Sequence, residues 1–109
     1  MPQAHKVLGQ VNPSAASLST LYTVPASTQA LCSTVCVCNT GATATTYRIA
    51  VRPAAAAIST SHYLVFDSSV AAYDSVMFTL GISLAATDVV SVYAGSANAA
   101  FSLFGVEIT

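Results

Sequence analysis

The feature that most constrains the fold of this chain is an alternation of apolar and polar residues with a period of two. Successive side chains on a β-strand point to opposite sides, so this period indicates strands. Residues 43–52 show it most clearly, with Thr45, Tyr47, Ile49 and Val51 on one face and Thr46, Arg48, Ala50 and Arg52 on the other. No segment shows the stripe of an amphipathic helix, so we expect an all-β protein.

The apolar runs are short, and turn residues separate them at intervals of about 8–12 residues, a spacing typical of β-sandwiches and jelly rolls. A chain of 109 residues is long enough for one hydrophobic core and too short for two. We therefore predict a single antiparallel β-sandwich or jelly-roll domain, residues 1–109, of about seven or eight short strands. The predicted strands are residues 6–11, 18–24, 29–39, 43–52, 62–67, 75–80, 88–93 and 99–108.

Residues 29–39 and 43–52 form the clearest predicted hairpin. The turn between them contains Asn39 and Gly41, two residue types that tolerate a positive φ. Both faces of the first strand are apolar or small, so we expect it to be buried on both sides. Strict alternation assigns its residues to two faces, Leu31, Ser33, Val35 and Val37 against Cys32, Thr34, Cys36 and Cys38.

The three cysteines, Cys32, Cys36 and Cys38, are an odd number within seven residues, which is a poor disulfide framework. Two of them, two positions apart on one strand, would have Cα atoms roughly 6.5–7 Å apart, at the outer limit for a disulfide. A zinc site needs four ligands, and neither histidine stands at ligand spacing from them. We therefore interpret them as small buried thiols and expect no metal or cofactor.

Charged residues make up only 6% of the chain, against about 25% in a typical soluble domain. Lys6, Arg48 and Arg52 are the only basic residues and the net charge is −1, which disfavours binding to nucleic acid or to an anionic membrane. A surface of Ser, Thr and Ala loses little free energy when a partner displaces its water. The composition thus favours extensive contact with other protein chains, although a neutral, solvated surface is the alternative.

The mean hydropathy of +0.67 raises the question of a membrane span. Arg52 and Pro53 interrupt the best apolar stretch, residues 49–58, whereas a spanning helix needs about 20 apolar residues in a row. The N-terminus has no apolar segment of the signal-peptide kind. We expect a soluble protein that is not secreted by the usual route.

Few residues could support catalysis. The titratable candidates are His5, His62, Asp67, Asp74, Asp88 and Glu107. Asp74 and Asp88 stand in turns, where aspartate commonly accepts hydrogen bonds from nearby backbone N–H groups. The chain has no Gly-x-Ser-x-Gly elbow and no phosphate-cradling glycine loop, so we predict no enzymatic activity and no small-molecule substrate.

The five tyrosines could form a platform on which sugar rings stack, but positions in the core or at an interface explain them better. They are Tyr22, Tyr47, Tyr63, Tyr73 and Tyr93.

Five segments occur in an order that resembles a known family. They are Lys-Val-Leu-Gly-Gln at 6–10, Leu-Tyr-Thr-Val-Pro at 21–25, Val-Cys-Asn at 37–39, Tyr-Arg-Ile-Ala-Val at 47–51 and Leu-Phe-Gly-Val-Glu-Ile at 103–108. With them the chain resembles small virion structural proteins of tailed bacteriophages, including phages of cyanobacteria and marine bacteria, over nearly its whole length. Where that family usually has Gly after Tyr-Thr-Val-Pro-Ala, this chain has Ser27, which weakens the expected turn.

The resemblance implies a many-copy component of a virion, assembled in the host cytoplasm. Among such roles it favours a capsid decoration (cement) protein that binds and stabilises the lattice of the major capsid protein, as a homotrimer. A tail, baseplate or fibre-associated protein is the alternative within that family, and a carbohydrate-binding module is the alternative outside it.

The N-terminal segment is the candidate contact with a partner. Residues 1–10 form either an arm that becomes ordered on a neighbouring subunit or a simple edge strand. Within this segment the candidate partner-binding residues are His5, Lys6, Val7 and Leu8.

Overall fold

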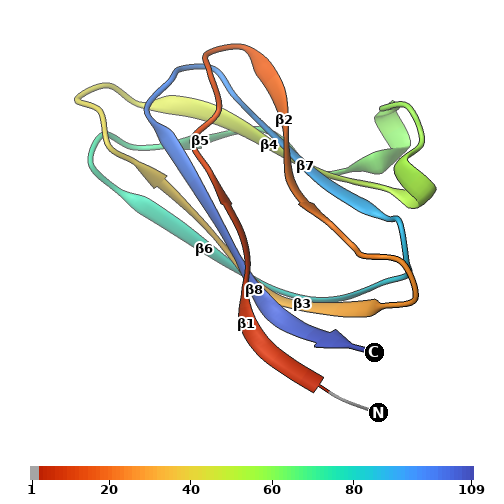
Figure 1. Cartoon of the computed structure of the whole chain (residues 1–109). Helices are drawn as coiled ribbons and strands as arrows, with labels where there is room; N and C mark the ends of the chain where they lie inside the picture. Colours follow the sequence, from red (N-terminus) through yellow and green to blue (C-terminus); the bar gives the residue numbers. More distant parts are fainter. Residues whose placement is uncertain (1–2) are drawn as a thin grey trace.

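A computed structural model describes residues 3–109; Met1 and Pro2, the start of the predicted arm, lie outside the described residues (Figure 1). The described residues form eight strands and two single turns of 3-10 helix, η1 (Pro53–Ala55) and η2 (Thr60–His62). No helix among them has the length and hydropathy required to cross a bilayer. The strands are β1 (Gln3–Val11), β2 (Ser17–Thr23), β3 (Gln29–Asn39), β4 (Thr45–Arg52), β5 (Tyr63–Val70), β6 (Ser75–Leu84), β7 (Val89–Ala94) and β8 (Ala99–Ile108).

The strands form two antiparallel sheets, each of four strands, that pack face to face (Figure 1). Sheet A has the order β1-β8-β3-β6, and sheet B has the order β2-β7-β4-β5. This is the jelly-roll arrangement, in which one long antiparallel hairpin is rolled up into two sheets. The strand pairs of that hairpin are β1–β8, β2–β7, β3–β6 and β4–β5. The predicted antiparallel β-sandwich is confirmed.

The hydrophobic core lies between the two sheets, where the alternation places one apolar face of each strand. Tyr47 of β4 is buried at its centre, with its ring 6.2 Å from that of Phe78 and 6.4 Å from that of Phe101. Tilted and edge-on contacts of this kind are the favoured geometry for aromatic rings. The faces predicted for residues 43–52 are confirmed, since Tyr47 and Ile49 are buried whereas Arg48 lies on the outside.

The predicted hairpin of residues 29–39 and 43–52 is wrong. β3 belongs to sheet A and β4 to sheet B, so the two strands face each other across the core and share no ladder. Both edges of each strand are already taken by partners in its own sheet, because β3 pairs with β6 and β8 and β4 pairs with β5 and β7. The five residues between the strands are enough to cross the gap of about 10 Å between packed sheets.

A β-bulge overturns the predicted faces of β3. The register of both its ladders shifts between Cys32 and Thr34. Against β8, Ser33 is the extra residue, whereas β6 has two residues, 80 and 81, opposite Ser33. As a result Cys32 is fully buried in the core, whereas Cys36 and Cys38 are partly exposed on the opposite face. The prediction of three buried thiols on one face is therefore wrong for two of them, and the prediction that β3 is buried on both sides is wrong as well.

Glycine at position 105 permits the close approach of β8 to β3 beside this bulge. A Cβ atom at Gly105 would lie 2.1 Å from the carbonyl oxygen of Leu31, a distance that no side chain tolerates. The backbone of β3 thus takes the space that a side chain on β8 would fill.

Asn39, at the end of β3, connects the loops at one end of the sandwich. It is 1% exposed, and its side-chain amide donates hydrogen bonds to the carbonyl oxygens of Thr43 at 2.8 Å, Ala71 at 3.2 Å and Val70 at 3.4 Å. Its carbonyl oxygen accepts the N–H of Gly41 at 3.0 Å. One buried side chain thus joins the β3–β4 loop to the β5–β6 turn.

We expect Asn39→Ala to lower the free energy of unfolding by about 2–3 kcal/mol, because it leaves buried backbone groups without partners. Urea unfolding followed by circular dichroism measures the change. Thr40→Ala is the matched control, since Thr40 is exposed and its hydroxyl makes one hydrogen bond at the same loop. Equal losses for the two variants would contradict the central role of Asn39.

Ser27 occupies a left-handed backbone conformation in the turn between β2 and β3, with φ 58°. This conformation costs an L-residue roughly 1–2 kcal/mol, whereas glycine adopts it freely. Glycine at this position would remove the strain.

We expect Ser27→Gly to raise the free energy of unfolding by about 0.5–1 kcal/mol, the strain relieved less the extra chain entropy of glycine. Thermal or urea unfolding measures it. Ala56→Gly is the control, because Ala56 is exposed and has an ordinary φ of −60°. A Ser27→Gly variant no more stable than the natural chain would show that the turn carries no strain.

Candidate interaction faces

The outer face of sheet A, which points away from sheet B, carries no charged side chain. The four strands of sheet A contain two charged residues, Lys6 and Glu107, and both point towards the inside of the sandwich, where they pair with each other. Strand register places the following on the outer face: His5, Val7, Gln10, Leu31, Thr34, Cys36, Cys38, Ser75, Met77, Thr79, Ser102, Phe104 and Val106.

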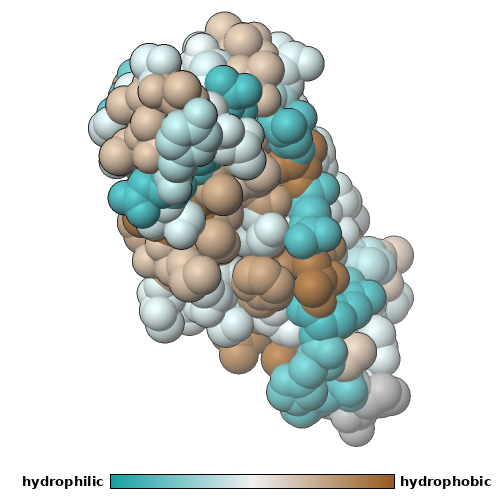
Figure 2. All heavy atoms as spheres, turned by 90° about the vertical axis from the view of Figure 1, so that its left-hand side faces the viewer, coloured by the Kyte–Doolittle hydropathy of each residue, from teal (hydrophilic) through white to brown (hydrophobic). Residues whose placement is uncertain are grey.

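Large apolar side chains on this face are open to solvent. Met77 is 70% exposed and Val7 is 48% exposed. They lie on β6 and β1, which are the two edge strands of the sheet. Phe104 and Cys36 lie between them, half-buried. Figure 2 views the molecule from the side on which β6 lies and shows apolar colours gathered over the middle of the surface. Contiguous exposed apolar surface is characteristic of contact sites.

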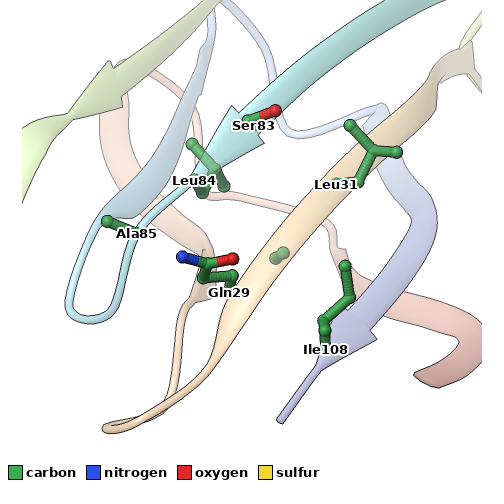
Figure 3. Close-up of a pocket in the computed structure, with 7 residues that line it drawn as sticks. Gln29, Leu31, Ser83, Leu84, Ala85 and Ile108 are labelled. Atoms are coloured by element: carbon green, nitrogen blue, oxygen red, sulfur yellow. The ribbon is translucent and has the colours of Figure 1, made fainter. Parts of the chain in front are cut away.

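A shallow hollow of about 350 Å³ lies at one end of this sheet, where β3, β6 and β8 end side by side (Figure 3). Leu31, Leu84 and Ile108 supply its apolar wall. A second hollow of about 280 Å³ shares Gln29 and Ile108 with it. Neither is lined by a titratable side chain, so neither offers a general acid, base or nucleophilic thiol.

The candidate partner-binding residues lie on β1, which is an edge strand of sheet A and pairs with β8 along its length. His5 and Val7 belong to the outer face. Lys6 points inward, and Leu8, at a register shift of the ladder, packs half-buried against the core. The structure therefore brings two of these four residues onto the uncharged face, and the described part of residues 1–10 is a strand of the sheet.

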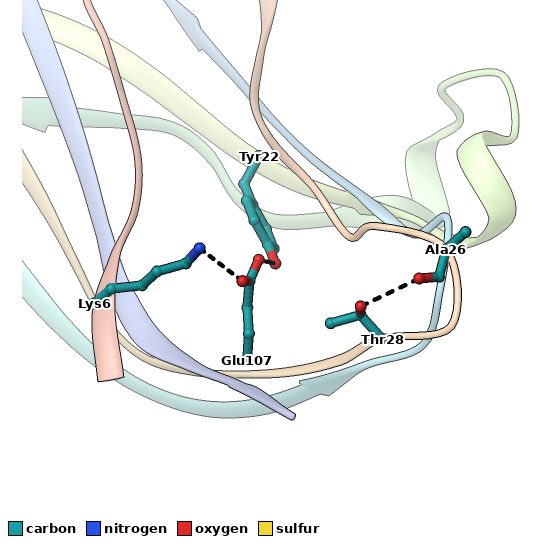
Figure 4. Close-up of polar contacts among 5 residues, drawn as sticks. All are labelled: Lys6, Tyr22, Ala26, Thr28 and Glu107. Atoms are coloured by element: carbon teal, nitrogen blue, oxygen red, sulfur yellow. Dashed lines mark hydrogen bonds and ion pairs between the residues drawn. The ribbon is translucent and has the colours of Figure 1, made fainter. Parts of the chain in front are cut away.

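Lys6 ties this edge strand to the sandwich through Glu107 (Figure 4). The ammonium group of Lys6 lies 2.7 Å from one carboxylate oxygen of Glu107, and the hydroxyl of Tyr22 in sheet B donates to the other at 2.5 Å. These two donors lower the pKa of Glu107. Burial and the neighbouring carboxylate raise the pKa of Tyr22 well above its usual value. The three side chains join both sheets at the end of the molecule where Ile108 lies.

The outer face of sheet B carries the Arg48 cluster, which consists of Arg48, Tyr63, Phe66, Asp67 and Tyr93. Two nitrogens of Arg48, Nε and Nη2, donate to the two carboxylate oxygens of Asp67 at 2.6 and 3.1 Å. The guanidinium carbon lies 4.1 Å from the ring centre of Phe66 and 4.3 Å from that of Tyr93. Tyr63 meets Phe66 edge-on, with ring centres 4.9 Å apart. The hydrogen bonds from Arg48 lower the pKa of Asp67.

Sequence reasoning missed the Arg48 cluster as a unit. Alternation did place Arg48 on the face opposite Tyr47, but Asp67 and Phe66 reach it through a register shift in the β4–β5 ladder and a positive φ of 53° at Asp67. Neither irregularity leaves a signal in the order of apolar and polar residues.

Every one of the seven charged side chains has a partner within the chain. Asp74 accepts the N–H of Ser75 at 2.8 Å, and Asp88 accepts the N–H groups of Ala54 and Ala85, both at 2.9 Å, as predicted for aspartates in turns. Arg52 donates to Ser91 and to the carbonyl oxygen of Ala56.

Within residues 3–109 no three His, Cys, Asp or Glu side chains come together as metal ligands could.

No known protein-family model matches this sequence, and a search of the curated proteins finds no significant match.

We expect the stability of the protein to fall as the pH decreases below about 4.5, the ordinary pKa of glutamate. The pKa of Glu107 is lower in the folded state than in the unfolded one. The stabilisation is therefore complete above the unfolded pKa and is lost as the pH falls through the folded pKa. Glu107→Gln should show a shallower decline of the urea midpoint between about pH 6 and pH 3.

Lys6→Met provides a matched variant, because it removes the ion pair and leaves the hydrogen bond from Tyr22 in place. It should lie between the natural chain and Glu107→Gln in this pH dependence. A Glu107→Gln variant with the same decline as the natural chain would exclude Glu107 as a source of acid sensitivity.

Proposed function

We propose that this chain is a non-enzymatic structural subunit that packs against protein neighbours through the outer face of sheet A, and that it acts as a capsid decoration protein. The observation that carries the proposal is an exposed four-stranded face on which apolar side chains are mixed with neutral polar ones and Lys, Arg, Asp and Glu are absent. Seven charged residues are few for a chain of 109, and all seven are held elsewhere by internal partners.

An uncharged face can be covered by another protein without loss of ion hydration, which is the main cost of burying polar surface. Four strands about 4.8 Å apart and about 30 Å long present roughly 600 Å² in projection. A stable interface of standard size buries about 800 Å² on each partner. The face is therefore close in size to one such contact, before any contribution from the adjoining hollows.

Two further points support a virion as the setting. The jelly roll is a common architecture of viral capsid subunits, which is an argument from the fold alone. The ordered segments described in the sequence resemble structural proteins of tailed phages. On this proposal the partner is the major capsid protein, and many copies on one lattice convert modest contacts into lasting attachment.

The test introduces a charge on the proposed contact face. Met77→Glu and Val7→Glu place a carboxylate at opposite edges of the outer face of sheet A, and each should weaken binding to capsids at least about tenfold, because an unpaired buried charge is costly. Co-sedimentation with capsids of the phage that carries the gene measures the affinity. Ser69→Glu, an exposed position on β5 in sheet B, should bind as the natural chain does.

Two results would contradict the proposal. Natural protein that fails to sediment with the capsids would exclude the decoration role. Natural affinity in both Met77→Glu and Val7→Glu would show that another surface makes the contact.

A further inference from the structure

We infer that the Arg48 cluster on the outer face of sheet B is a binding site for a neutral saccharide. The site does not depend on the proposed function, because it lies on the opposite face of the sandwich from the proposed capsid contact. It would leave the chain with one face for packing and one for a soluble or surface-bound sugar.

The cluster forms a row across the sheet. Cross-strand pairing places Leu18 of β2 opposite Tyr93 of β7, and Tyr93 opposite Arg48 of β4. Phe66 of β5 continues the row on the far side of Arg48. The row thus runs over all four strands of sheet B, at right angles to them, as a ridge of apolar and aromatic groups with one guanidinium in its middle.

The aromatic rings offer surfaces for the C–H face of a pyranose ring. Phe66 is 56% exposed, and the guanidinium of Arg48 covers only one of its two faces. The edge-on contact with Tyr63 holds the ring of Phe66 in place. A large apolar ring that is both exposed and held in place binds a flat apolar partner with little loss of entropy.

The polar groups suit vicinal hydroxyls and no net charge. Arg48 has five N–H donors, of which Asp67 takes two, and each oxygen of Asp67 keeps a free lone pair. A donor and an acceptor therefore stand side by side, as a pair of neighbouring hydroxyls requires. Because the guanidinium and the carboxylate neutralise each other, the site has no preference for an anionic sugar.

Asp67, which presents its carboxylate to Arg48, is held at a positive φ of 53°, a conformation that is uncommon for L-residues. Backbone strain that positions an exposed polar group is characteristic of ligand sites.

The experiment is saturation-transfer NMR of the full chain with maltotetraose, cellotetraose and chitotetraose, and with tetragalacturonic acid as the anionic comparison. We expect binding of at least one neutral tetrasaccharide. Phe66→Ala and Tyr93→Ala should each weaken it about tenfold, the order expected for loss of one stacking ring. Phe66→Tyr should retain it. Met77→Ala, which removes an exposed apolar side chain on the other face, should leave it unchanged.

Melting curves of all variants establish that each one is folded. No binding of any neutral tetrasaccharide would overturn the inference. So would natural affinity in Phe66→Ala, equal losses in Phe66→Ala and Met77→Ala, or a preference for tetragalacturonic acid. Because capsid binding is measured separately and through the other face, failure here leaves the proposed packing role standing, and the reverse also holds.

Discussion

The structure depends on the burial of one apolar face of every strand between two sheets. Residues such as Tyr47, Ile49, Phe101 and Leu103 supply this buried layer, and they come from strands in both sheets. The rolled-up hairpin follows from the same requirement, because each strand must find a partner in its sheet and a facing strand across the core. Exceptions to regular pairing, such as the bulge in β3, occur where a side chain must be turned into or out of that layer.

The few charged residues serve as connectors of this framework. Lys6 and Glu107 join the edge strand to the core and, through Tyr22, to the second sheet. Asp88 joins the β6–β7 turn to η1 through two backbone N–H groups. Because Lys6 and Glu107 point inward, the outer face of sheet A is uncharged. The outer face of sheet B instead bears the ion pair of Arg48 and Asp67, which aromatic rings surround.

Much of the fold could be predicted from the alternation alone. The approximate strand positions, the placement of Arg48 on the face opposite Tyr47 and the backbone hydrogen bonds of Asp74 and Asp88 all agree with the structure. Pairing could not be predicted, and the assumed hairpin of residues 29–39 and 43–52 shows why. Local turn signals at Asn39 and Gly41 are compatible with a hairpin or with a crossing between sheets, and the choice depends on distant strands. The Arg48 cluster was missed for the same reason, since its members come from three strands.

The sequence by itself determined that the chain is all-β, forms a single sandwich and has too few ions to cover its surface, because these properties follow from period and composition. Only the tertiary structure decided which faces are left open. A single extra residue, Ser33, inverts the direction of every later side chain on β3, and so places Cys36 outside and Val35 inside. Such a shift is set by packing against β6 and β8, and residue order along one strand does not encode it.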